Sequence, residues 1–301
     1  MDLSRFGAAT PWSLGVEEEL MLVDAETLEP SRDGFSRAFG EATERIKPEL
    51  FESFVEITTA VVETPEEAEA ELRTLRQEVA ERAAEHGLAV LATGSHPTAR
   101  VRIPLVPVER YQRMKAELGP RLNRQQVCGL HVHVSLPDPD TCLRAFEGVV
   151  PRLPALLADS ANSPYWDGAY SGWRSIRSQI LLEMPTGGTP PVLRSWDDWE
   201  AATQGDSKRR HWDAWPRPEY GTLEVRVLDQ QTSLRRTVEL AAEVQRLVRE
   251  AAQMDGPPLD RADYAAQRDA AGREGGGPEA ERQLELGPEA AVREIAARTL
   301  G

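Results

Sequence analysis

Alternating polar and apolar residues in four short segments, together with one short apolar run, predict five β-strands. Side chains of a strand point to opposite faces in turn, so this alternation gives each strand one face suited to packing and one polar face. The predicted strands cover residues 15–23, 51–62, 88–92, 126–136 and 222–229. The polar residues of the four alternating strands are the first indication of where a functional site lies.

Apolar residues spaced three and four apart predict the helices that would cover such a sheet. The clearest helix begins where Thr64 can act as N-cap, with Pro65 in the first turn and Glu67 completing a capping box, and it ends at Gly87. Further helices are predicted over residues 109–118, 141–160 with breaks at Pro151 and Pro154, 173–182, 233–253 and 289–299.

The order of these elements favours an α+β fold. Strands and helices are mixed without regular βαβ alternation, which predicts a largely antiparallel sheet of about six strands with helices on its outer face. Residues 162–191 are rich in Gly, Pro, Ser and aromatic side chains and are predicted to form a long functional loop. No domain boundary is evident before about residue 256. We therefore expect a single domain over residues 1–301, with a Gly- and Pro-punctuated tail from about residue 256.

The polar faces of the four alternating strands carry an unusual concentration of carboxylates and imidazoles. These residues are Glu17, Glu19, Glu56, His131, His133 and Glu224. A sheet with one face in water would explain any one of these strands, but explains all four together less well. Two histidines two apart on a strand point to one side, and oxygen and nitrogen ligands without cysteine suit Mg²⁺ or Mn²⁺. Arg226, two residues from Glu224 on the same face, adds a planar fork for a phosphoryl oxygen.

Several other classes of site are absent from the sequence. There is no P-loop motif, no G-x-S-x-G nucleophile elbow and no H-E-x-x-H motif, and the glycines at 275–277 follow no predicted strand. A cupin or amidohydrolase needs further histidines, and the only others are His86, His96 and His211.

Composition narrows the partners and the compartment. The chain has 35 basic and 50 acidic residues, and a formal charge of −15 disfavours nucleic acid as a partner. No stretch is apolar enough to span a membrane, and residues 1–5 have no apolar core like that of a signal peptide. With only Cys128 and Cys142, we expect free thiols and a cytoplasmic location.

Seven short segments, in order along the chain, resemble the type 2 glutamate–cysteine ligases, also called carboxylate–amine ligases, of the glutamine synthetase-like superfamily. The segments are GVEEEL at 15–20, VEITT at 55–59, GSHP at 94–97, ERY at 109–111, CGLHVHV at 128–134, SIRSQ at 175–179 and GTLEVRVLD at 221–229. The resemblance implies a curved antiparallel sheet that forms a cradle for Mg-ATP, with helices outside.

The resemblance also assigns roles to individual residues. The implied metal ligands are Glu17, Glu19, Glu56, His131 and Glu224. Arg226 and Arg177 are the implied catalytic residues. Nucleotide binding is expected from Arg110, Arg226 and Thr222, and substrate binding from His96, Arg177 and His133.

The activity implied by the resemblance is an ATP-dependent ligation. The carboxylate of glutamate or a similar acid would take the γ-phosphoryl group of ATP, and an amino-acid amine, such as that of cysteine, would then displace phosphate and form an amide. Two alternatives remain: a catalytically degenerate member that only binds nucleotide, since Trp215 stands where the family pattern has arginine, and a phosphotransferase to a guanidino group or another amine. A homodimer is a further expectation.

Overall fold

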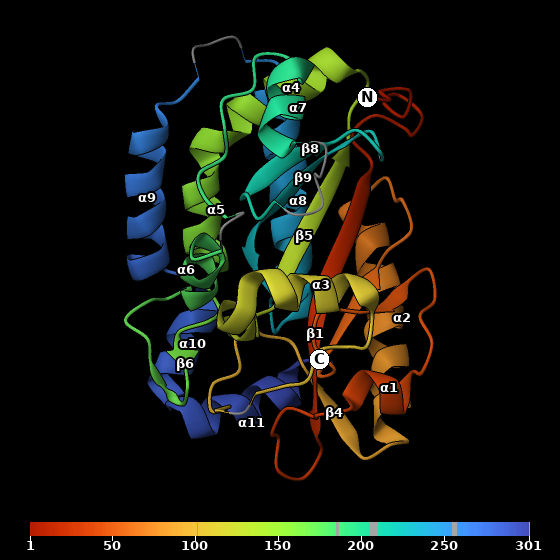
Figure 1. Ribbon diagram of the computed structural model, residues 1–301, viewed down its shortest axis with the longest axis vertical. Helices are drawn as coiled ribbons and strands as arrows, with labels where there is room; N and C mark the ends of the chain where they lie inside the picture. Colours follow the sequence, from red (N-terminus) through yellow and green to blue (C-terminus); the bar gives the residue numbers. More distant parts are fainter. Residues whose placement is uncertain (101, 185–186, 205–209, 255–257, 301) are drawn as a thin grey trace.

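The computed structural model describes residues 1–100, 102–184, 187–204, 210–254 and 258–300 (Figure 1). Its centre is an open sheet of seven antiparallel strands in the order β2-β3-β1-β5-β9-β8, with β4 paired to the second half of β1. The strands are β1 (Leu14–Asp24), β2 (Ile46–Pro48), β3 (Phe54–Thr58), β4 (Leu88–Leu91), β5 (Gly129–Ser135), β8 (Ala214–Arg217) and β9 (Thr222–Asp229). A separate hairpin joins β6 (Tyr165–Trp166) and β7 (Ala169–Tyr170).

The helices surround this sheet. They are α1 (Gly34–Ala38), α2 (Pro65–Ala84), α3 (Glu109–Leu118), α4 (Pro139–Val149), α5 (Leu153–Ser160), α6 (Ile176–Leu182), α7 (Trp196–Thr203), α8 (Leu234–Ala251), α9 (Arg261–Glu274), α10 (Pro278–Leu286) and α11 (Pro288–Arg298), with 3₁₀ turns η1 (Gly119–Arg124) and η2 (Val150–Arg152). No helix in the described parts of the chain is both long and apolar enough to cross a membrane.

The two faces of the sheet have different coverings. On one face, α2, α4, α5 and α8 pack over apolar side chains such as Leu20, Val132 and Val225, and this forms the main core. On the other face, α3 crosses in front of β1 and β5 (Figure 1), and Tyr111 of α3 packs in a second, smaller core with Met21 and Phe54. The second core covers only part of that face, so its polar residues stay accessible beneath α3.

A buried ion pair lies on the helix-covered side of β1. Arg76 of α2 donates two hydrogen bonds to the carboxylate of Glu18, at 2.6 and 2.7 Å, and both side chains are almost completely buried. Glu18 also accepts hydrogen bonds from Gln230 and Thr237, and Arg76 donates to the backbone carbonyl of Thr299, among others. This network joins β1, α2, α8 and the C-terminal helices at one point.

The five predicted strands are all present, and the α+β prediction is confirmed. The segment predicted as a strand over 51–62 forms a continuous strand only at Phe54–Thr58, and Phe51 and Val62 form isolated bridges with Leu105 and Leu14. The predicted sheet of about six strands has seven, since the short strands β2 and β8 were not recognised. Helix 141–160 is broken at η2, as its prolines predict. Cys128 and Cys142 are both free and buried, as expected.

In its described part, the segment predicted as a tail contains two unpredicted helices, α9 and α10, and α11, which matches the helix predicted over residues 289–299. α9, α10 and α11 follow the Gly- and Pro-rich positions, and α9 packs against α5 while α11 contacts β4. The small apolar stripe of α9 explains why its helical period was missed. Whether residues 1–301 form one domain stays a prediction.

The capping box at the start of α2 is confirmed, and it gives a measurable effect. Thr64 accepts from the backbone N–H of Glu67, whose side chain accepts in return from the N–H of Thr64. Loss of a side-chain cap costs about 1 kcal/mol. We expect Thr64→Ala to lower the free energy of unfolding in urea by that amount, whereas Thr64→Ser should keep it; equal stability of all three proteins would contradict this role.

Candidate functional site

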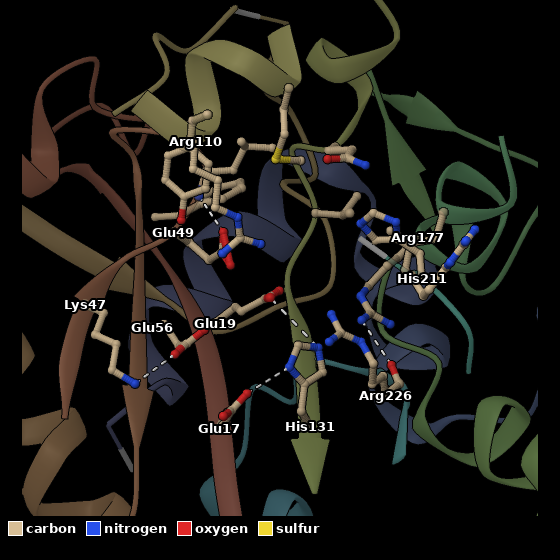
Figure 2. Close-up of a pocket in the computed structure, with 18 of the residues that line it drawn as sticks. Glu17, Glu19, Lys47, Glu49, Glu56, Arg110, His131, Arg177, His211 and Arg226 are labelled. Atoms are coloured by element: carbon tan, nitrogen blue, oxygen red, sulfur yellow. Dashed lines mark hydrogen bonds and ion pairs between the residues drawn. The ribbon is translucent and has the colours of Figure 1, made fainter. Parts of the chain in front are cut away.

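The polar face of the sheet forms one wall of a cavity, and α3 forms the opposite wall (Figure 2). Acidic residues gather at one side of this cavity and arginines at the other. Its charged and histidine lining residues are Glu17, Glu19, Lys47, Glu49, Glu56, Arg110, His131, Arg177, Arg210, His211, Arg217 and Arg226. The cavity therefore has an acidic side suited to cations and a basic side suited to anions.

Strand register brings the predicted metal ligands together. Glu17 lies opposite His131, Glu19 lies opposite Glu56, and His133 of β5 lies opposite Glu224 of β9. Nδ1 of His131 is 3.3 Å from a carboxylate oxygen of Glu17, and its Nε2 is 3.9 Å from Glu19. Four residues of the predicted set line one cavity, namely Glu17, Glu19, Glu56 and His131, whereas the fifth, Glu224, does not.

Glu224 differs from the other carboxylates because it lies behind the cavity wall. It is fully buried, and its oxygens accept hydrogen bonds from Trp215 Nε1 at 2.8 Å, from Arg226 Nη1 at 2.8 Å and from Arg217. Burial by itself would raise the pKa of Glu224, but the charges of Arg226, His133 and Arg217 lower it below its usual range. Glu224 is thus held as a carboxylate.

A metal ion fits the donor set on the chemistry of its atoms. Among the described residues, ligand atoms of Glu17, His133 and Glu224 all lie within 4.8 Å of one another. The Nε2 atoms of His131 and His133 are buried and have no hydrogen-bond partner among the residues that the structure describes. Buried polar atoms are normally satisfied, so these two nitrogens are available to a cation.

The carboxylates on the acidic side of the cavity are too close together and too buried for all of them to be ionised near neutral pH. Burial, then the neighbouring charge of Glu17, raises the pKa of Glu56 to about 8. Burial and the charge of Glu19 raise the pKa of Glu49 to about 7. Burial alone would raise the pKa of Glu17, but its hydrogen bond with His131 and the charge of His133 lower it to about 2. Divalent cations would supply the positive charge that these groups otherwise take from protons.

Arg226 and Arg177 lie on the basic side, whereas Arg110 lies over the acidic side. Arg226 lies on β9 with its side chain 24% exposed to the cavity, and it contacts Glu224 through one nitrogen. Arg177 of α6 is buried, and its guanidinium donates to the backbone carbonyls of Arg226 and Val227. Arg110 lies on α3 above the acidic side, near Glu49 (Figure 2). All three line the cavity.

Three predicted binding residues, Thr222, His96 and His133, do not line it. His133 lies behind the wall, with its Nε2 3.6 Å from a carboxylate oxygen of Glu17. Thr222 is buried, and its hydroxyl is hydrogen-bonded to Nδ1 of His133 at 2.9 Å, so we propose that it orients His133 rather than contacting nucleotide. His96 lies beside a separate small pocket; its Nε2 contacts the carbonyl of Leu28 at 2.8 Å, and its Nδ1 accepts from the N–H groups of Thr98 and Ala99. We propose that His96 fixes this loop rather than contacting substrate.

Sequence analysis missed several lining residues. Lys47 and Glu49 alternate before Phe51 and continue the polar face onto β2, so period-2 spacing was the available signal. Arg217 was not predicted, because Pro216 interrupts the alternation of polar and apolar residues in β8. Arg210 and His211 lie just before β8, and only tertiary structure brings them to the cavity.

The buried imidazole of His96 predicts a pH dependence of stability. Burial lowers the pKa of His96 to about 4, against 6.5 for an ordinary histidine. Between pH 6.5 and 4 this histidine binds a proton in the unfolded chain but not in the folded chain. Its contribution to stability is therefore full above pH 6.5 and falls as the pH drops through this range. The loss is about 3 kcal/mol at pH 4.

Urea unfolding between pH 7 and pH 4 measures this loss. We expect His96→Gln to be less stable at pH 7 but to lose less stability on acidification than the unmodified protein. His86 is exposed, so His86→Gln serves as the control and should leave the pH profile unchanged. A His96→Gln profile parallel to that of the unmodified protein would contradict the assignment.

Sequence comparisons place these residues in a known family. Residues 13–273 match the model of glutamate–cysteine ligase family 2. A relative from Rubrobacter xylanophilus, provisionally named glutamate–cysteine ligase 2-1, is 40% identical over 249 residues, covering 79% of this chain and 66% of the relative. A relative from Herpetosiphon aurantiacus, provisionally named glutamate–cysteine ligase 2, is 35% identical over 248 residues, covering 78% of this chain and 64% of the relative. The chain thus spans slightly less than two thirds of the length of these relatives.

Solved structures agree on the fold. A bifunctional glutathione synthetase from Pasteurella multocida superposes with a TM-score of 0.67 at 17% identity, covering 96% of this chain and 49% of the other. A glutamate–cysteine ligase from Francisella tularensis, solved with AMP, superposes with a TM-score of 0.64 at 13% identity, covering 95% of this chain and 78% of the other. The family match over residues 13–273 includes every strand of the central sheet and the whole cavity wall, and the chain belongs to glutamate–cysteine ligase family 2.

Proposed function

We propose that this protein is an ATP-dependent carboxylate–amine ligase that joins glutamate, or a similar acid, to an amino-acid amine such as that of cysteine. The observation that carries the proposal is that one cavity has an acidic side with imidazoles, called the acidic wall below, and a side with arginines, called the basic wall. The ion pair of Glu224 and Arg226 joins the two. Membership of the family and the two ligase folds support the class of reaction.

The acidic wall is the proposed site for Mg²⁺ or Mn²⁺. Glu17, Glu19, Glu56, His131 and Glu224 form the predicted set, and we add His133 and Glu49 from their positions. When bound, the ions neutralise the β- and γ-phosphates of ATP. The protein's own carboxylates hold the ions' positions, and Thr222 and Glu17 hold the two imidazoles in orientation.

The basic wall is the proposed site for the phosphoryl group that is transferred. A carboxylate oxygen of the acid attacks the γ-phosphorus, the bond to the bridging oxygen breaks and ADP leaves. The amine nitrogen then attacks the acyl carbon, inorganic phosphate leaves and the amine loses a proton. Arg226 presents its free nitrogens to the phosphoryl oxygens, while Arg110 and Arg177 add positive charge around them.

The position of Trp215 bears on the alternative of an inactive nucleotide-binding member. Trp215 is buried in the cavity wall and donates to Glu224, and Arg217 donates to the same carboxylate oxygen from two residues along β8. An arginine therefore reaches Glu224 even though residue 215 is tryptophan. This supports an active site that differs in detail, rather than a lost one.

The test is ADP release with Mg-ATP and a panel of acids and amines, followed by product analysis. A ligase gives an amide, ADP and phosphate only when both an acid and an amine are present. A phosphorylated amine or guanidino product would favour the phosphotransferase, and nucleotide binding without ADP release would favour the inactive member. The identity of the acid and amine, a cytoplasmic location and a homodimeric state remain predictions.

A further inference from the structure

α9 touches α6, which carries Arg177, and is hydrogen-bonded to Asp213, whose backbone pairs with that of Arg226 on β9. It belongs to the segment predicted as a tail, and no residue of α9 lines the cavity. Tyr264, Arg268 and Gly272, spaced four apart on one face of the helix, are all buried. What they contact determines what α9 does.

The first contact fixes the entry to β8. Tyr264 donates its hydroxyl to a carboxylate oxygen of Asp213, and Arg268 forms a bidentate pair with both oxygens, with Nη2 at 2.9 Å from Oδ1. Asp213 is 4% exposed, and its backbone carbonyl accepts from the N–H of Arg226 at 2.8 Å. Asp213 therefore connects α9 directly to the backbone of Arg226, next to the strand that carries Trp215.

The second contact fixes α6. The carbonyl of Gly272 accepts from the N–H groups of Arg174 and Ser175 at 2.9 and 3.0 Å, just before α6 begins. Arg268 Nη2 also donates to the carbonyl of Ser178 at 3.1 Å, next to Arg177. A Cβ atom added at Gly272 would lie 2.9 Å from Oγ of Ser178 and 3.3 Å from the ring of Trp173, so a larger residue would require α6 or these side chains to move.

We propose that α9 is a positioning element for the basic wall: Arg268 and Tyr264 set the place of Arg226 through Asp213, and Gly272 sets the place of Arg177 through α6. This proposal rests on the proposed function, because the roles of Arg226 and Arg177 come from it. A displacement of about 1 Å at reacting groups can cost on the order of 10²-fold in rate, so three buried residues of a helix outside the cavity are able to control turnover.

Conservative variants separate positioning from simple packing. Tyr264→Phe removes only the hydroxyl on Asp213, Gly272→Ala adds one methyl group against α6, and Gln267→Ala alters an exposed residue of the same helix as the control. Crystal structures of the variants are expected to show Arg226 shifted in Tyr264→Phe and Arg177 shifted in Gly272→Ala, with neither shifted in Gln267→Ala. Unmoved guanidinium groups would overturn the proposal, whether or not the protein turns over.

Kinetics provide the second readout. We expect Tyr264→Phe to lower kcat for ADP release at least fivefold with KM for ATP changed less than twofold. Gly272→Ala should raise KM for the acid at least fivefold. Gly272→Ser is expected to behave like Gly272→Ala. Variants that are only less stable to urea, with unchanged kcat and KM, would show a purely structural helix, whereas an unmodified protein that releases no ADP with any acid and amine would reject the proposed function instead.

Discussion

Replacing Arg226 by lysine is expected to lower the rate of ADP release by 10²–10³-fold, with a much smaller effect on the affinity for Mg-ATP. Arg226 uses one guanidinium nitrogen on Glu224, at 2.8 Å, and has the rest of its fork directed to the cavity. Lysine keeps the charge but has no planar fork, so it cannot hold Glu224 and a phosphoryl oxygen in fixed geometry together. The loss of a donor to developing charge typically costs about 2.7–4 kcal/mol in the transition state.

Replacing Glu224 by glutamine is expected to affect nucleotide affinity as well as turnover. Glu224→Gln keeps the shape but removes the charge that faces Glu17 and His133, so we expect the affinity for Mg-ATP to fall together with turnover. Calorimetric binding of Mg-ATP and a steady-state assay of ADP release on both variants separate the two roles. Arg235→Lys, at an exposed position of α8, is the matched control and should behave like the unmodified protein. Activity of Arg226→Lys within a few-fold of the control would reduce the pair to an ordinary ion pair, worth about 0–1 kcal/mol.

The largest effect on stability is expected at Arg76. Removing one partner of a buried pair leaves an uncompensated charge and costs about 3–5 kcal/mol. In Arg76→Met the carboxylate of Glu18 keeps only the neutral donors Gln230 and Thr237, and the carbonyls of Gln231 and Thr299 lose a donor. In urea unfolding, we expect Arg76→Met to have a lower free energy of unfolding and a lower midpoint concentration of urea than the unmodified protein.

Two further variants define the cause. Arg73 lies three residues earlier on α2 and pairs with Glu69 at the surface, so Arg73→Met should change the free energy of unfolding by less than about 0.5 kcal/mol. The double variant Glu18→Gln/Arg76→Met no longer buries a charge, and it should be more stable than Arg76→Met alone. If Arg73→Met and Arg76→Met were equally stable, the network behind β1 would contribute no more than a surface pair.

The sequence predicted the acidic wall better than any other part of the molecule. Glu17, Glu19 and Glu56 could be assigned to one face because strand geometry alternates strictly, and register then made Glu19 and Glu56 neighbours. Lys47 and Glu49 escaped prediction because a three-residue strand gives too short a period to recognise.

The basic wall was less predictable, for a physical reason. Arg217 and Arg210 come from a short edge strand and the loop before it, whose positions depend on contacts with distant elements rather than on local spacing. The role of α9 was beyond the reach of sequence patterns, because its contacts with Asp213 and α6 join residues about 50 to 100 positions apart. His96 lies in a matching segment, but its Nε2 contacts the carbonyl of Leu28 in a distant loop and its Nδ1 accepts from Thr98 and Ala99, contacts that no local pattern indicates.

Three consecutive glutamates in β1 make the length of that strand unusually hard to change. Glu17 and Glu19 face the cavity, and Glu18 between them faces Arg76 in the interior. Inserting or deleting one residue before them would turn Glu18 to the cavity and place two carboxylates in the apolar core, with a single arginine to meet them. Natural variation can therefore exchange side chains along β1, but changes of length should be found only in the turn that follows Asp24, where added residues alter neither face.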